Sequence, residues 1–397
     1  DQFRALVHQA LDHAKRLGAS DAAAEASEGY GLSVSVRKGE LETVERNRDK
    51  GLGVTVYLGQ RRGHASTSDF GVRAVEQAVQ AAYDIARFTA EDPAAGLPDA
   101  EVMATEHRDL DLFHPWAVTA ERAADLAREA EAAAFATNSR IANSEGAGVS
   151  AQHSHFFSAH TRGFEGGYAS TRHTLSVAPI AVSGDDMQRD AWYTSMRRAR
   201  DMATPEAVGR YAAERALSRL NARKIPTTEC PVLFEAPLAA GLLGSFVHAV
   251  SGGSLYRKTT FLNDSLGKSV FASHIDIHED PFIPMGKGSS PFDEEGVRVR
   301  ARDVVTAGEL QGKLGTGLFV IELMGQGVNG VTGDYSRGAS GFWVENGVIA
   351  YPVHEITIAG NLKTMYQGIT AIGADAYNQG AKTVGSVLID RMTVPGT

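Results

Sequence analysis

The sequence holds one cysteine, Cys230, among 397 residues. A single cysteine excludes a disulfide framework within the chain and any metal site that needs several thiolates. No apolar run approaches the roughly 18 residues of a membrane span, and no signal-peptide pattern opens the sequence. Positive charge is also in short supply, since 39 Lys and Arg stand against 48 Asp and Glu, a net charge of −9. We therefore expect a soluble, intracellular protein that binds neither membranes nor, directly, nucleic acid.

The chain is rich instead in hydrophobic residues, at 43%, and in glycine, at 42 of 397. The hydrophobic content allows a large buried core, and the glycine content indicates many tight turns and a β-rich architecture. Helical spacing from Phe3 to Leu17 gives way to alternating apolar residues at 32–36 and 52–56, which predict half-buried strands with a charged polar connection at 45–50. Further helices are predicted at 72–88, 119–136, 204–221 and 238–250, and a short strand at 231–234.

These elements predict an α+β fold with two domains. Residues 1–222 would form an N-terminal α/β domain whose helices pack on a curved antiparallel sheet. Residues 223–397 would form a C-terminal, mostly antiparallel β domain, strand-like from Gly252 onward and containing the buried helix 238–250. The dipeptide Asn346-Gly347 lies between two strand-like runs and predicts a type I′ hairpin, because both residues accept a positive φ.

Two patterns resemble ligand sites without meeting their requirements. Gly325-Gln-Gly-Val-Asn-Gly330 fits G-x-G-x-x-G, but no amphipathic helix follows it to hold a pyrophosphate, so we interpret it as a glycine-dense turn. His274, Asp276, His278 and Asp280 alternate with two isoleucines and would place four potential metal ligands on one strand face. A half-solvated strand with its isoleucines toward the core explains this pattern better, and a hydrolase that uses this face is kept as an alternative.

The remaining candidate side chains are interpreted as structural. His153 and His155 share a strand face with His160 close behind, and we expect a surface position for them. His248 lies on the apolar helix 238–250 as a packed or capping residue, and Cys230 is expected to pack rather than react. H-E-x-x-H and G-x-S-x-G are both absent, so the residues alone show no self-sufficient catalytic site.

The C-terminal half nevertheless carries long, specific motifs. It resembles the TldD/PmbA family, and most closely the PmbA branch, also called TldE, over essentially the whole chain. The segments that carry the resemblance are Ser251-Gly-Gly-Ser-Leu-Tyr-Arg-Lys258, Glu279-Asp-Pro281, Glu322-Leu-Met-Gly-Gln-Gly-Val-Asn329, Thr332-Gly-Asp-Tyr-Ser-Arg-Gly-Ala-Ser-Gly-Phe-Trp-Val-Glu-Asn-Gly347 and Glu355-Ile-Thr-Ile-Ala-Gly-Asn-Leu362.

This resemblance implies a cytoplasmic bacterial protein that pairs with a TldD-type subunit, or forms a homodimer in its absence. The pair would be a zinc metallopeptidase that degrades or trims unfolded peptides. The branch is also named for modulation of DNA gyrase, which we interpret as an indirect effect because the acidic chain offers no support for DNA contact. A stand-alone homodimeric peptide-binding protein is the main alternative.

In such a pair the TldD subunit carries the zinc ligands, H-E-x-x-x-H on a helix and a distant cysteine. Aligned on the shared Arg-Lys, those positions fall on residues without metal-binding atoms or a general base, namely Gly244, Ser245, Ala249 and Ile372. His248 is one residue out of register. The resemblance therefore implies that this chain binds no cofactor and has no catalytic residue, and that zinc belongs to the partner.

The resemblance leaves two further expectations. Arg257, Lys258 and Arg337 are candidates for binding substrate carboxylates, although solvated surface charge explains them as simply. The family usually has a long Gly- and Ser-containing segment between Gly312 and Lys313, which is missing here. Its absence indicates either a true deletion or a disordered stretch that the sequence omits.

Overall fold

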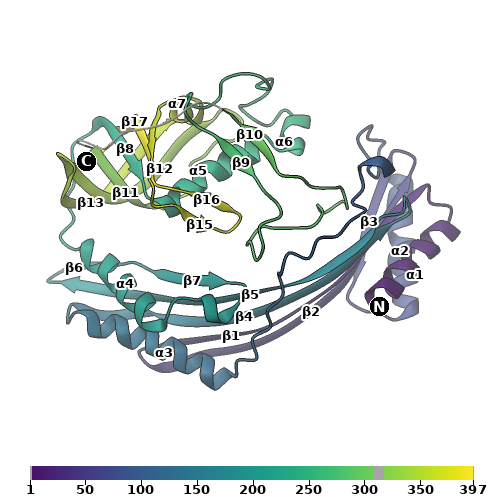
Figure 1. Ribbon diagram of the computed structural model, residues 1–397, viewed down its shortest axis with the longest axis horizontal. Helices are drawn as coiled ribbons and strands as arrows, with labels where there is room; N and C mark the ends of the chain where they lie inside the picture. Colours follow the sequence, from purple (N-terminus) through teal and green to yellow (C-terminus); the bar gives the residue numbers. More distant parts are fainter. Residues whose placement is uncertain (1, 307–316, 397) are drawn as a thin grey trace. The chain divides into compact units, whose positions relative to one another are not determined.

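The computed structural model describes residues 2–306 and 317–396. The chain forms two compact units that are interleaved in sequence (Figure 1). The first contains the described residues up to Ile180 with Asp190–Glu214 and Asp280–Ala301, and the second contains Ala181–Arg189, Arg215–Glu279 and the described residues from Arg302 onward. The division expected after residue 222 stays a prediction. The Gly312–Lys313 junction lies outside the described residues.

The first unit is built on an antiparallel sheet of very long strands in the order β3-β2-β1-β4-β5, with β7 beside β5 (Figure 1). The strands are β1 (Asp21–Arg37), β2 (Glu40–Leu58), β3 (Arg61–Thr67), β4 (Ile141–His160), β5 (Glu165–Ser183) and β7 (Trp192–Met196). Strand β6 (Asp186–Arg189) follows β5 in the sheet order. Together with the last residues of β5, it belongs to the second unit.

Helices cover one face of this sheet. They are α1 (Gln2–Arg16), α2 (Val72–Phe88) and α3 (Ala120–Thr137), with α4 (Pro205–Ser218) following β7 and the short helix η2 (Ala199–Asp201). Even-numbered residues of β1, from Ala22 to Val36, are mostly buried toward the helices, because side chains alternate between the two faces of a strand. The odd-numbered residues of β1 therefore point to the opposite face, which holds the cavity described below.

The second unit is a mixed sheet in the order β13-β12-β11-β8-β17-β14, and one further residue pair, Ala359 of β13 with Thr393 of β17, links β13 to β17. The strands are β8 (Thr228–Phe234), β11 (Gly317–Met324), β12 (Asp334–Glu345), β13 (Val348–Asn361), β14 (Ile369–Ile372) and β17 (Val387–Val394). Its helices are α5 (Ala236–Ala249), α6 (Gly252–Tyr256) and α7 (Leu362–Gln367), and two small pairs are β9 (Ile277–Glu279) with β10 (Arg302–Val305) and β15 (Tyr377–Gln379) with β16 (Lys382–Val384). Phe246 of α5 packs in the core with Phe271 and Tyr366.

The α+β class is confirmed, and so is the hairpin at residues 346–347. Asn346 and Gly347 have φ values of 52° and 78°, as a type I′ turn requires. The interpretation of residues 45–50 as a polar connection is wrong: they lie inside β2, and the β1–β2 turn is at Lys38-Gly39. Residues 40–50 are exposed along β2, so this half of the strand carries charge without the alternation that identifies a half-buried strand.

The expectation that the chain is strand-like from Gly252 onward is only partly correct. Helices α6 and α7 interrupt it, and residues 257–276 form turns and loops. The strand proposed across residues 274–280 is also shorter than expected. Only Ile277–Glu279 is extended, as β9, so the four alternating His and Asp side chains do not share a strand face.

Candidate functional site

Helix α5 holds three of the four positions at which the family resemblance places zinc chemistry. Gly244 and Ser245 are partly exposed, and Ala249 is 2% exposed. The Ser245 hydroxyl donates a hydrogen bond to the Gly241 carbonyl oxygen at 3.1 Å, one turn back on the same helix. The Ser245 hydroxyl thus bonds within its own helix, and serine has no carboxylate that could act as a general base on a water molecule.

The hairpin β15–β16 packs against α5 and brings Lys382 to Gly244. A Cβ built on Gly244 would lie 3.3 Å from Cε and 3.6 Å from Nζ of Lys382. The space that a side chain at position 244 would enter is thus taken by the end of a lysine. An ammonium group at this distance would repel a divalent metal ion.

The fourth position, Ile372, ends strand β14 and packs against the hydrophobic core. Just beyond it, Asp375 accepts hydrogen bonds from the backbone N–H of Ser386 at 2.9 Å and from its hydroxyl at 2.6 Å. Burial alone would raise the pKa of Asp375, but these hydrogen bonds outweigh burial and lower it. Because a Cβ on Gly373 would lie 2.1 Å from the Asp375 carboxylate, the tight turn requires glycine there. These contacts give the segment that follows Ile372 a structural role.

These residues do not fit a zinc ion. Glycine, alanine and isoleucine have no side-chain donor atom, and zinc sites are built from imidazole, thiolate and carboxylate groups. Throughout residues 2–306 and 317–396, no group of three or more His, Cys, Asp and Glu side chains is arranged to hold a metal.

The three basic residues proposed for substrate carboxylates do not form one cluster through direct contacts. Arg257 caps the C-terminus of α6 and Lys258 follows it with a φ of 54°, both exposed. Arg337 lies on β12, half-buried, close to the phenol of Tyr335, whose burial raises its pKa to about 12. In the described part of the chain, no hydrogen bond or ion pair joins Arg337 to the other two.

The other sequence candidates have structural explanations, some of them different from those expected. Cys230 is buried, and burial raises the pKa of its thiol to about 11, which confirms that it packs. The run 325–330 forms turns without a helix, as predicted. His278 pairs with Asp303 at 2.8 Å on the exposed β9–β10 pair. His248 is exposed rather than packed.

The surface position expected for the histidines of β4 is wrong for His160 and only partly correct for His153 and His155. His160 is 6% exposed, and its ring stacks on Phe164 with the centroids 5.5 Å apart. His153 and His155 are half-buried and contact the ring of Tyr30 on β1. The alternation of residues along β4 could not predict this burial, because the rings that cover these histidines come from neighbouring strands and loops.

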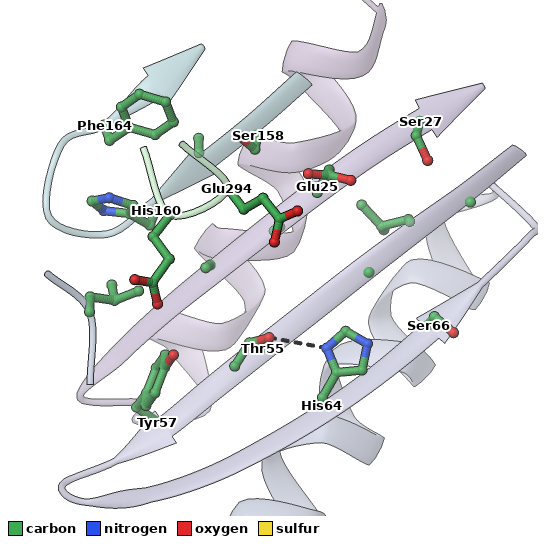
Figure 2. Close-up of a pocket in the computed structure, with 18 of the residues that line it drawn as sticks. Glu25, Ser27, Thr55, Tyr57, His64, Ser66, Ser158, His160, Phe164 and Glu294 are labelled. Atoms are coloured by element: carbon green, nitrogen blue, oxygen red, sulfur yellow. Dashed lines mark hydrogen bonds between the residues drawn. The ribbon is translucent and has the colours of Figure 1, made fainter. Parts of the chain in front are cut away.

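Sequence reasoning also missed a cavity of about 610 Å³ on the helix-free face of the first unit (Figure 2). Glu25 of β1, Thr55 of β2, His64 of β3 and His160 of β4 line it, and Glu294 reaches it from a loop. The Thr55 hydroxyl and the Nδ1 atom of His64 are 3.0 Å apart. These residues carry no common motif, since they meet only through strand pairing and a distant loop.

Comparison with known proteins shows one family across the chain. Three family models of the PmbA/TldA metallopeptidases match the chain. The model of domain 1 matches residues 22–86, that of the central domain matches 113–220, and that of the C-terminal domain matches 227–315 and 309–396. Metalloprotease PmbA of Escherichia coli O157:H7 is 44% identical over 99% of this chain and 97% of its own length. A Metalloprotease PmbA homolog of Haemophilus influenzae is 40% identical over 100% and 96%.

Solved structures share the fold. A candidate modulator of DNA gyrase from Bacteroides thetaiotaomicron superimposes with a TM-score of 0.93 at 22% identity, covering 100% of this chain and 99% of that one. TldE from Thermococcus kodakarensis superimposes with a TM-score of 0.83 at 15% identity, with both chains fully covered. In the part of the chain that the structure describes, no helix combines the length and apolar character needed to cross a membrane.

Proposed function

Because the chain belongs to the PmbA/TldD metallopeptidase family, we propose that it is the non-catalytic subunit of a peptidase whose zinc is carried by a TldD-type partner. In this proposal the two chains associate in the cytoplasm as a heterodimer and act on unfolded peptides. This chain contributes part of the substrate-binding surface and leaves the chemistry to its partner.

The observation that carries the proposal is the packing of Lys382 against Gly244. A zinc peptidase needs ligands and a general base on this helix, and the chain offers glycine, serine and alanine with a lysine ammonium beside them. The helix is otherwise retained in a buried, well-packed form, with the Tyr366 hydroxyl donating a hydrogen bond to the Leu242 carbonyl oxygen at 3.1 Å. In this proposal, helix α5 supports the fold and supplies no reactive group.

Peptide binding has support in the edge of the second unit's sheet. Strand β14 is the last strand in the order and pairs on one side with β17, within the described residues. An extended peptide can add to such an edge through backbone hydrogen bonds, which do not depend on the peptide's sequence. Arg257, Lys258 and Arg337 lie in the same unit and would add attraction for substrate carboxylates.

The test is reconstitution from purified subunits. Light scattering on each chain and on the mixture should show a 1:1 complex, and only the mixture should cleave an unfolded peptide efficiently. Failure of the chains to associate at micromolar concentration would overturn the proposal. A stable dimer of this chain that ignores the partner and still binds peptide would favour the stand-alone peptide-binding protein instead.

A second arm tests the substrate residues. Replacing Arg257, Lys258 and Arg337 together by Gln should weaken binding of an acidic unfolded peptide to the complex without preventing assembly. Lys268→Gln is the matched control, because Lys268 is an exposed cation of the same unit outside this group. Equal weakening by both changes would contradict a specific role for the three residues.

A further inference from the structure

The cavity of the first unit has a floor shaped for a ligand side chain. Glu25 of β1 pairs with Gly53 on β2 and with Ser158 on β4, so its two cross-strand neighbours are small. A Cβ on Gly53 would lie 3.3 Å from the ring of His64. The ring of His64 thus lies over Gly53, and neither cross-strand neighbour places a long side chain beside the Glu25 carboxylate, so a ligand group can approach it there.

The opposite wall is a turn held in place by its own small core. Phe292 is 2% exposed and packs edge-on against Phe164, with ring centroids 5.0 Å apart. Asp293 closes the turn by accepting hydrogen bonds at one carboxylate oxygen from the backbone N–H groups of Glu295 and Val297. Gly296 has a φ of 79°, and a Cβ there would lie 2.5 Å from the Phe164 ring. The fixed turn presents Glu294 and Glu295 to the cavity.

Negative charge dominates the lining. The carboxylates of Glu25, Glu294 and Glu295 make no ion pair or hydrogen bond within the described chain, and Arg62 beside Tyr57 is the one Lys or Arg among the lining residues. Figure 2 shows the Glu25 and Glu294 carboxylates facing the same space. Surrounding protein and repulsion from Glu294 raise the pKa of Glu25. A bound cation would relieve this repulsion.

The cavity also offers one buried donor. His160 lies in the wall, and its Nδ1 accepts a hydrogen bond from the Arg162 backbone N–H at 3.2 Å, which places the ring proton on Nε2. That Nε2 is buried and has no hydrogen-bond partner among the residues that the structure describes. Burial lowers the pKa of His160 and keeps the ring neutral at pH 7. A ligand with a carbonyl oxygen near its cation would satisfy this donor as well as the carboxylates.

We propose that this cavity binds the lysine or arginine side chain of a peptide or protein segment. The cationic head would lie between Glu25 and Glu294, and its methylene stem would contact the apolar wall that includes Leu97 and Phe164. The carbonyl oxygen of the same segment would accept from His160. This site lies wholly in the first unit and does not depend on the partner-subunit role, because the lone chain should show it.

The test uses a fluorescent, acetylated peptide with one lysine in a Gly-Ser background and an otherwise identical peptide with norleucine, which keeps the methylene stem without the charge. Fluorescence anisotropy with the lone, full chain should show the lysine peptide binding at least about tenfold more tightly, which corresponds to about 1.4 kcal/mol. Glu25→Gln and Glu294→Gln should each abolish this preference. Glu42→Gln, an exposed carboxylate of β2 outside the cavity, should leave it unchanged.

Three results would overturn the proposal. Equal binding of both peptides would show that no cation site exists, and an unchanged preference in Glu25→Gln and Glu294→Gln would place the site elsewhere. Tighter binding of spermidine than of the lysine peptide would assign the cavity to free polyamines. Thermal unfolding of each variant confirms that it is folded, and Glu294→Gln, at an exposed turn, keeps the test valid if Glu25→Gln is unstable.

Discussion

The side chain of Lys382 lies directly in front of Gly244, with Cε 3.3 Å and Nζ 3.6 Å from the place that a Cβ on the glycine would occupy. The space in front of Gly244 therefore holds the end of a lysine side chain, while helix α5 packs on the core through its other residues.

Gly244→Ala should stabilise the protein by about 0.5–1 kcal/mol, because alanine is the better helix former and the flexible end of Lys382 can move aside. Gly209→Ala is the matched control in helix α4. A Cβ there would lie 2.1 Å from the Ala130 backbone oxygen, so this change should cost about 2–3 kcal/mol. Urea unfolding of the two variants measures both values, and destabilisation by Gly244→Ala would show that Lys382 is rigidly held.

Arg215→Met should destabilise the second unit by about 3 kcal/mol, because it leaves the Glu235 carboxylate without its partner in a largely buried place. The two side chains form a pair with hydrogen bonds of 2.6 and 3.1 Å and are only 12% and 14% exposed. Arg215→Met with Glu235→Leu should recover most of the loss. Arg4→Met, in the exposed pair with Glu165, should have a much smaller effect, and equal losses would contradict this account.

The thiol of Cys230 should not react with iodoacetamide at pH 8 while the protein is folded. Burial raises its pKa to about 11, so almost no thiolate forms, and the side chain is 8% exposed. Labelling followed by mass spectrometry should detect modification only after unfolding in urea. Rapid labelling of the native protein would mean that β8 opens in solution.

Stability should fall as the pH drops below about 6.5, the ordinary pKa of histidine. Burial lowers the pKa of His160 and of the fully buried His173, so the unfolded chain binds protons that the folded chain does not. Each such group removes up to about 1.4 kcal/mol per pH unit between the unfolded and folded pKa values. His173→Gln should reduce the slope of unfolding free energy against pH between 6.5 and 5, and an unchanged slope would contradict the assignment.

The sequence predicted the elements whose signals are local. The helix expected at 72–88 is observed as Val72–Phe88, and the one expected at 204–221 is observed as Pro205–Ser218, with a shorter end. The turn at Asn346-Gly347 was also predicted correctly, because both residues accept the positive φ that a type I′ turn requires. What failed was strand length. The charged residues 40–50 pair with β1 while exposed, so no apolar alternation marks them.

The candidate sites were predictable only in part, for a related reason. The four positions on α5 and β14 were found through family resemblance, but nothing near Gly244 in the sequence indicates Lys382. The cavity residues Glu25, His160 and Glu294 come from two strands and a loop, and only the pairing of β1 with β4 and the Phe292 core bring them together. Contacts set by tertiary packing have no local pattern to reveal them.

The non-catalytic role is tested most directly by the zinc content of the purified chain alone, dialysed against buffer without chelator and measured by elemental analysis. We expect less than about 0.1 zinc per chain, because Gly244, Ala249 and Ile372 have no metal-binding side-chain atoms. A value near one zinc per chain would contradict the assignment of Gly244, Ala249 and Ile372 and the non-catalytic role built on it.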